Sequence, residues 1–509
     1  MANTGSNMCS ENPDVYCEIE ATVPTGFEPA TKQEIQDKLG VSSVVERGHA
    51  LFKIPVKDAL KCLELQSVDN LYVVVKHFEH IEYPDDKDGS LQVIGELVPK
   101  MDYTVPLNVW KQFIHFDHEV SPLPCKNWLD QHAAETPCGN IKGGELELSD
   151  SENVVAKKPK CSEIDNMDGP SVKNDSTVNT NSIESSVSTQ DAPPAKQPWI
   201  DSLPAFRATC YRTGSNHAFQ SQQAAHHFGG ILQDYFGWNV SMKQFDIEVV
   251  LNITGPKAYV TVGLTKQSRH KRHISHFGPT TLRPTICFSM LYICQIQPGD
   301  VVCDPMCGGG SLPIEAAINW PQSVHICGDI HDKAYNRAKM NIDCLNNKYE
   351  IKGKPKIDIQ VFQWNTCSLP LQDNYVDVFV TDLPFGRRSG SKADNRKLYP
   401  DVLRELARVS KRSTGRACIL TQDKRTIQRA LDGMQKLWKR RSTFWVNIGG
   451  LAAGVYLIQR TKNVYSAGKD NRKGEDDSNK LEEDNSGGEN DNKTNSTKDE
   501  EKVTENTIN

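Results

Sequence analysis

The pattern of apolar and polar residues differs between parts of the chain. Between residues 285 and 460, short apolar runs of strand length alternate with amphipathic stretches of helical period. This alternation predicts an α/β domain with a doubly wound, mostly parallel sheet. In residues 16–135 and 199–266, strand-like and helix-like pieces follow one another in a looser order. That order predicts α+β structure ahead of the α/β domain.

Two further segments show no periodicity. Residues 136–198 are rich in Ser, Asn, Asp, Lys and Pro, and the chain from residue 466 is a low-complexity run of Asp, Glu, Lys and Asn. Such segments bury too little apolar surface to offset the entropy of ordering. We therefore predict this organisation: 1–15 disordered, 16–135 an N-terminal domain, 136–198 a flexible insertion, 199–266 a second domain, 267–465 the α/β domain and 466–509 a disordered acidic tail.

The elements of the α/β domain follow from the same pattern. Open α/β sheets bind ligands outside the carboxyl ends of their strands, so the residues at those ends deserve the closest inspection. Helices are expected at 285–296, 311–320, 331–345, 398–411 and 426–438. Strands are expected at 300–305, 325–330, 357–364, 376–382 and 416–422, with a final pair within 444–460.

Charge is distributed unevenly along the chain. The net charge of −6 conceals a basic part, since residues 199–465 hold 35 Lys and Arg against 20 Asp and Glu. Residues 1–135 hold 11 against 22. A basic half of this kind favours a polyanionic partner, and the acidic parts mask it in the total.

Composition also bears on the compartment. The sequence has no run of about 18 apolar residues and no N-terminal apolar stretch, so we expect neither a membrane span nor a cleaved signal. Many of the 15 cysteines lie in apolar runs, as expected in a reducing compartment. We expect a cytoplasmic protein, with the nucleus as the alternative. Without any C-x-x-C pair, we predict no metal site.

The first strand of the α/β domain ends in a glycine loop, VVCDPMCGGGSLPIEAA. Glycines let the backbone approach a ligand closely, and the following helix offers free N–H groups. The loop matches neither a phosphate-binding loop nor the G-x-G-x-x-G fingerprint. The acid ahead of it favours a cationic or amine-bearing ligand. The residues we expect to contact that ligand are Asp304, Cys307, Gly308 and Gly310.

The next two strands end in polar residues that suit a nucleoside. Asp329 ends the second strand, where an acid commonly accepts hydrogen bonds from ribose hydroxyls. Asn365 ends the third strand and could hold an adenine edge. A cation, a ribose and an adenine together describe S-adenosylmethionine. Asp and Asn are also common in turns and caps, so each residue alone carries little weight.

The stretch TDLPFG ends the strand predicted at 376–382 and resembles the D/N-P-P-Y/F motif of methyltransferases that act on exocyclic base amines. Such an amine is a poor nucleophile because its lone pair is delocalised into the ring. The Asp382 carboxylate and the Leu383 carbonyl can accept its two N–H bonds, and Asp382 can take the proton. Pro384 fixes the turn, and Phe385 can stack on an extruded base. Leu383 replaces the first proline and Asp382 replaces asparagine, which leaves the identity of the amine open.

At family level, the sequence resembles the THUMP-linked tRNA guanine-N2 methyltransferases. The similarity is carried by FRATCYRTGSNHAFQSQQAAHHFGGILQDYFGW, HFGPTTLRPTICFSML, DPMCGGGSLPIEAA and TDLPFGRR, and covers most of residues 16–465. It implies a Rossmann-like class I methyltransferase domain preceded by a ferredoxin-like α+β domain and a THUMP domain. These correspond to residues 267–465, 16–135 and 199–266.

The resemblance also implies an activity and partners. It implies that the two N-terminal domains grip the acceptor end of tRNA and that N2-methylguanosine forms in the acceptor region. A small zinc-binding activator subunit is an expected partner. From the residues themselves, we expect phosphate contacts from six basic side chains: Lys266, Arg269, Lys271, Arg272, Arg387 and Arg388.

Two alternatives stay open at this point. The same chemistry could serve another amine, such as adenine N6 in RNA or DNA, because the motif does not choose the base. The chain could instead be a non-catalytic RNA-binding protein with a decayed methyltransferase fold. Intact Asp304, Asp329, Asp382 and Phe385 argue against decay.

Overall fold

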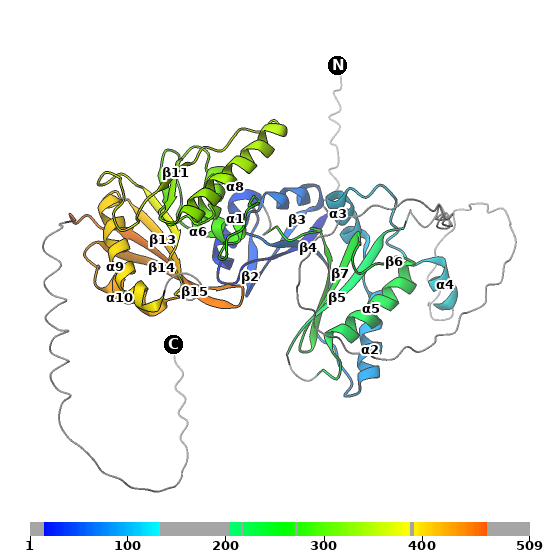
Figure 1. Cartoon of the computed structure of the whole chain (residues 1–509). Coiled ribbons are helices and arrows are strands. Elements are labelled where there is room, and N and C mark those ends of the chain that lie inside the picture. The colour runs from blue at the N-terminus through cyan, green and yellow to red at the C-terminus, as the bar shows by residue number, and fades with distance from the viewer. Residues whose placement is uncertain (1–14, 133–202, 215–216, 270–272, 387–390, 466–509) are drawn as a thin grey trace, which may run out of the picture. The chain divides into compact units, whose positions relative to one another are not determined.

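A computed structural model describes residues 15–132, 203–214, 217–269, 273–386 and 391–465 (Figure 1). The predicted disorder of 1–15 (residue 15 excepted), the flexible insertion 136–198 and the tail 466–509 lie outside the described residues. The chain divides into two compact units. The first unit comprises Met1–Glu18, Pro55–Leu60 and Tyr72–Lys266, and the second unit comprises Ile19–Ile54, Lys61–Leu71 and Gln267–Asn509. The domain boundaries drawn from the sequence remain a prediction.

The first unit contains a mixed sheet in the order β4-β8-β7-β5-β6. β5 and β7 are parallel, whereas β8 is antiparallel to both β7 and β4. The helix α5 packs against β5, and α2 packs against α5. The elements are β4 (Asn70–Phe78), α2 (Lys87–Gly95), η2 (Val98–Lys100), α3 (Thr104–Ile114), α4 (Lys126–His132), β5 (Ala205–Thr213), α5 (Ser221–Phe236), β6 (Asn239–Val240), β7 (Ile247–Thr254) and β8 (Lys257–Gly263).

The second unit contains a seven-stranded sheet in the order β11-β10-β9-β12-β13-β15-β14. Its strands are parallel except β15, which is antiparallel to both of its neighbours. The strand order reverses between β9 and β12, which creates the switch point where such sheets bind ligands. The strands are β9 (Val301–Asp304), β10 (Val324–Asp329), β11 (Gln360–Gln363), β12 (Val378–Asp382), β13 (Arg416–Thr421), β14 (Trp438–Ile448) and β15 (Leu451–Arg460).

Helices α9 and α10 supply side chains to an apolar cluster with one face of this sheet, and α7 and α8 contribute to a second cluster. Phe379, Tyr399 and Leu406 are among the fully buried residues of the first cluster. The helices are α6 (Pro284–Tyr292), α7 (Ser311–Asn319), α8 (Asp332–Ile351), α9 (Lys392–Val409) and α10 (Lys424–Asp432).

The second unit also includes residues from the N-terminal part of the sequence. They form α1 (Glu28–Leu39) and the hairpin of β2 (Ser43–Glu46) and β3 (His49–Pro55). Helix α1 contacts α6, where the Tyr292 hydroxyl bonds to Asp37 and the Lys38 ammonium lies 5.0 Å from the Phe288 ring centroid. Four elements are divided between the units, namely β1 (Tyr16–Thr22), β3, the 3₁₀ helix η1 (Val56–Glu64) and β4.

Several predicted elements differ from the observed ones. Helix α10 ends at Asp432 and β14 begins at Trp438, so the expected helix end at 438 falls in a strand. Helix α8 runs to Ile351, six residues beyond the expected end at 345. Helix α9 begins at Lys392 rather than 398, because Ser391 and Asp394 form a reciprocal capping box that starts it earlier. Strand β11 is limited to the four residues that pair with β10, whereas 357–364 was expected. Helix α6 ends at Tyr292, four residues before the expected end. Within the described ranges, no helix is long and apolar enough to cross a membrane.

Candidate active site

Three carboxylates lie at the carboxyl edge of the seven-stranded sheet. Asp304 ends β9, the strand between β10 and β12. Asp329 ends β10 and Asp382 ends β12, each about two residues further along than Asp304 in the strand register. The structure therefore brings together the three acids that the sequence placed at strand ends.

The glycine loop connects β9 to α7 and bends toward β10. Gly308 and Gly310 have φ values of 53° and 85°, which favour glycine. The Cys307 N–H donates to the Gly328 carbonyl over 2.9 Å, and the Gly308 N–H donates to Asp329 Oδ2 over 3.1 Å. Space is open beside Gly308, where an added Cβ would meet no atom within 4 Å. The buried Cys307 side chain belongs to the same apolar cluster as Cys327 of β10.

Asp304 is buried, and its two oxygens differ. Oδ1 accepts from the Met306 N–H over 3.2 Å, while Oδ2 has no hydrogen-bond partner. Burial raises the pKa of Asp304 to about 7, and the charge of Asp329 adds to this, whereas the Thr381 hydroxyl and the Met306 N–H lower it. A buried carboxylate oxygen left unpaired suits a cationic ligand.

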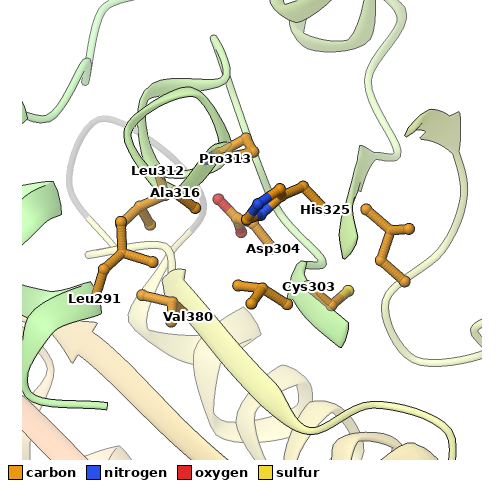
Figure 2. Close-up of a pocket in the computed structure, with 10 residues that line it drawn as sticks. Leu291, Cys303, Asp304, Leu312, Pro313, Ala316, His325 and Val380 are labelled. Atoms are coloured by element: carbon orange, nitrogen blue, oxygen red, sulfur yellow. The ribbon is translucent and has the colours of Figure 1, made fainter. Parts of the chain in front are cut away.

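A small cavity of about 10 Å³ lies behind this carboxylate, the size of about one water molecule (Figure 2). Asp304 lines it with His325 of β10 and apolar residues of α7. His325 Nε2 bonds to the Trp320 carbonyl over 2.9 Å, and its Nδ1 has no partner. Burial lowers the pKa of His325, so the ring is neutral and offers Asp304 no compensating charge.

Asp382 is partly exposed at the end of β12. Loss of solvation by the surrounding protein raises its pKa well above the ordinary value, and the charges of Asp304 and Asp329 raise it further. Three neighbouring acids therefore resist being ionised together. A bound cation would relieve that repulsion.

Asn365 lies just after β11 and is exposed. Its Oδ1 accepts from the Cys367 N–H over 2.9 Å, so the side chain is held within its own turn. The neighbours of Asn365 tie this turn to the glycine loop, because Trp364 Nε1 and the Thr366 hydroxyl both donate to the Pro305 carbonyl, over 3.0 and 2.8 Å. Sequence reasoning missed these two side chains, which it had no means of connecting to a loop about 60 residues away.

The turn TDLPFG is clamped from α9. The Pro384 carbonyl accepts from Asn395 Nδ2 over 3.0 Å and from the Tyr399 hydroxyl over 2.6 Å. The Leu383 N–H donates to the Leu420 carbonyl of β13 over 2.9 Å, and its side chain is buried. The Phe385 ring stays partly exposed. The residues Asn395 and Tyr399 were not predicted, and their spacing of one helical turn was the only available signal.

The structure describes two of the six expected phosphate-binding residues, Lys266 and Arg269. Lys266 Nζ lies 3.4 Å from Asp246 Oδ1 in the first unit. Arg269 is anchored in the second unit, where its guanidinium donates to the Leu63 carbonyl over 2.7 Å and its N–H to the Asp69 carbonyl. The other four, Lys271, Arg272, Arg387 and Arg388, lie outside the described residues. In the described part of the chain, no cluster of three or more His, Cys, Asp or Glu could hold a metal ion.

Comparisons with known proteins identify the family. A family model described as UPF0020, RMKL-like, methyltransferase domain matches residues 269–453. A Mus musculus relative, tRNA (guanine(6)-N(2))-methyltransferase THUMP3, is 39% identical over 477 residues, or 92% of this chain and 94% of the relative. The Homo sapiens protein of the same name is 40% identical over 484 residues, with the same coverage. The chain belongs to the tRNA guanine-N2 methyltransferase family. 

Solved structures agree with this family in fold. TrmN from Thermus thermophilus matches with a TM-score of 0.57 and 17% identity, covering 87% of this chain and 99% of TrmN. The protein SMU.472, solved in complex with SAH, matches with a TM-score of 0.56 and 15% identity, covering 89% of this chain and 100% of SMU.472. These similarities confirm the Rossmann-like methyltransferase fold predicted from the sequence.

As a member of the tRNA guanine-N2 methyltransferase family, the chain is an enzyme that uses S-adenosylmethionine. The residues present fit this methyl donor. The unpaired Asp304 Oδ2 suits a cationic group, and the open side of Gly308 allows close approach to the backbone. Asp329 accepts from the backbone N–H groups of Gly308 and His331, which fixes its carboxylate at the end of β10.

Proposed function

We propose that this enzyme forms N2-methylguanosine at guanosine 6 of tRNA. The relatives named for that reaction share 39 to 40% identity with more than nine-tenths of this chain. The observation that carries the proposal is the clamped turn Asp382–Phe385 at the carboxyl edge of the sheet, beside the buried Asp304.

The cofactor-binding roles follow from the geometry of the loop. When bound, S-adenosylmethionine supplies an electrophilic methyl group on a positively charged sulfur. Asp304 would balance positive charge, and Asp329 would accept from ribose hydroxyls with the lone pairs that Gly308 and His331 leave free. The backbone of Cys307, Gly308 and Gly310 would line the site. Asn365 would meet the adenine edge after releasing its bond to Cys367.

The catalytic roles belong to the turn after β12. Asp382 and the Leu383 carbonyl would accept the two N–H bonds of guanine N2 and so aim its lone pair at the methyl group. As the N–C bond forms, N2 loses one proton, which the Asp382 carboxylate is placed to accept because a bound cation favours its ionised form. Pro384 holds the turn, and the partly exposed Phe385 would stack on the extruded base.

Replacing Asp382 by Ala tests this assignment. Methyl transfer to tRNA should fall at least 100-fold, the lower range for losing a general base, while the affinity for tRNA stays within about two-fold. The measurement is transfer of labelled methyl, with and without cell extract, followed by nucleoside analysis. The matched control is Asp373→Ala, an exposed carboxylate ahead of β12. Full activity in the Asp382 variant would refute the role, and label in N6-methyladenosine would refute the choice of base.

We also propose the partners and the compartment. Phosphates of the tRNA would contact Lys266, Arg269, Lys271, Arg272, Arg387 and Arg388. A small zinc-binding activator subunit would assist the enzyme, as the family resemblance implies; activity that requires extract and is lost with a zinc chelator would support it. The cytoplasm, with the nucleus as the alternative, is consistent with free thiols at the twelve cysteines that the structure describes. Cell fractionation would test the location.

A further inference from the structure

A large aromatic side chain is exposed on the edge strand β14 of the second unit. Trp445 is 57% exposed, whereas Trp438 at the start of the same strand is buried. Its indole makes an edge contact with the buried Tyr456, at 6.3 Å between ring centroids. The Lys424 ammonium, at the start of α10, lies 4.3 Å from the Trp445 ring centroid. The indole is therefore held in place and paired with a cation.

The register of the sheet places Trp445 near the catalytic edge. Trp445 pairs with Gly454 of β15, Gly454 pairs with Thr421 of β13, and Asp382 of β12 pairs with Leu420, the neighbour of Thr421. Trp445 is thus level with Asp382 and three strand spacings away, or about 14 Å. That separation is too large for contact with the target base, but it suits a nucleotide nearby on the same strand of RNA.

Basic residues lie near Trp445 at the start of α10. Lys424 and Arg425 stand there, next to the acid Asp423, whose carboxylate accepts from the Thr426 N–H. Further along β14, toward the amino edge of the sheet, Arg440 and Arg441 donate to the neutral side chains of Gln428 and Gln459. Arg425 is exposed. An exposed indole beside basic side chains is typical of surfaces that bind single-stranded nucleic acid.

We infer that Trp445 and Lys424 form a binding site for a nucleotide that flanks the target guanosine. The inference rests on the proposed tRNA substrate. The base of that nucleotide stacks on the indole, and the Lys424 ammonium, which lies over the ring in the free protein, moves to the adjacent phosphate. The pair thereby positions the RNA so that the target base reaches Asp382.

The test compares Trp445→Ala, Trp445→Phe and Lys424→Ala with the unchanged chain. The substrate is a tRNA transcript with guanosine at position 6, and cell extract is present in every assay. Trp445→Ala should raise KM for the transcript roughly 5- to 150-fold, the range expected for loss of one base–aromatic stack. The values of kcat and of KM for S-adenosylmethionine should stay within about two-fold. Trp445→Phe should restore most of the loss, and Lys424→Ala should make binding less sensitive to salt.

Tyr375→Ala is the matched control, because Tyr375 is 41% exposed and precedes β12, at the amino edge of the same sheet. If Trp445→Ala changed KM no more than Tyr375→Ala, the inference would be wrong. A lower melting temperature with unchanged KM would show a purely structural role for Trp445, and a lost response to extract would show a protein partner instead. Failure of the unchanged chain to methylate the transcript would instead reject the proposed function.

Discussion

Asp304 combines burial, an unpaired oxygen and a pKa of about 7. Because this pKa is higher than that of an unfolded aspartate, the folded state gains from the protonated form. That contribution to stability is complete below the unfolded value of about 4 and is lost as pH rises through 7. Above pH 7, the ionised side chain therefore opposes folding by about 4 kcal/mol at most.

Asp304→Asn removes this ionisable group. We expect the variant to melt at a higher temperature than the unchanged chain at pH 8, and the difference to disappear near pH 4. S-adenosylmethionine should bind the unchanged chain more tightly at pH 8 than at pH 6, and the Asn variant should bind weakly at both. Thermal melting and calorimetry measure these effects, and the variant also reports any titration of the ligand itself. A pH 8 melting temperature below that of the unchanged chain would contradict the expected sign.

Single residues were predictable where a local pattern marked them. Asp304, Asp329 and Asp382 each follow an apolar run, and parallel strands then bring them to one edge. Asn365 was placed at a strand end, but its engagement with Cys367 was not foreseen. Tyr399, Trp364 and their bonds to proline carbonyls depend on tertiary contacts between distant segments, which one sequence cannot reveal.

At the scale of elements, α9 fixes the position of the catalytic turn through hydrogen bonds to the Pro384 carbonyl. The Tyr399 hydroxyl bonds to the Pro384 carbonyl and also lies 2.7 Å from the Thr421 hydroxyl of β13. The ends of β12 and β13 are thus joined through one buried phenol. The predicted start of α9 at 398 would have placed Tyr399 in the first turn; the capping box at Ser391 instead puts it in the third turn, where the backbone is better fixed.

Tyr399→Phe tests whether these hydrogen bonds from α9 support catalysis. Loss of the hydroxyl leaves the Thr421 hydroxyl and the Pro384 carbonyl short of a partner, at a cost of about 1–3 kcal/mol in the free energy of unfolding. We expect kcat to fall roughly 10- to 100-fold because small displacements at a reacting centre are costly. The affinity for S-adenosylmethionine should not change. The control is Tyr349→Phe, at a partly buried tyrosine of α8. An unaltered kcat in the Tyr399 variant would show that α9 has no part in catalysis.

At the scale of the whole molecule, the second unit joins segments from both ends of the sequence. The Thr285 hydroxyl donates to Asp69 Oδ1 over 2.7 Å, and the Asp69 carbonyl accepts from the Arg269 N–H and the Ser268 hydroxyl. The Asn447 N–H donates to the Thr25 carbonyl over 3.1 Å. The alternation of strands and helices predicted the α/β sheet, but periodicity carries no information about this packing of residues 19–54 and 61–71 within the second unit.

Asp69→Ala measures how much the hydrogen bond between Asp69 and Thr285 contributes to stability. The change leaves the buried Thr285 hydroxyl unpaired, so we expect a loss of about 1.5–3 kcal/mol in stability, seen as a lower melting temperature. Thr285→Val supplies the second arm of a double-mutant cycle. If the two side chains act together, the double variant should be little worse than Asp69→Ala alone. Additive losses would mean that the bond contributes nothing of its own.

The bond between Asn447 and Thr25 also bears on the order of synthesis. The ribosome makes about 420 residues between these two partners, which takes roughly 20–80 s at ordinary elongation rates. For that time, the Thr25 backbone that meets β14 has no partner within the growing chain, and the α1 surface waits about 245 residues for α6. The second unit can therefore be completed only after its last strands leave the ribosome, and until then its earliest segment is exposed to aggregation.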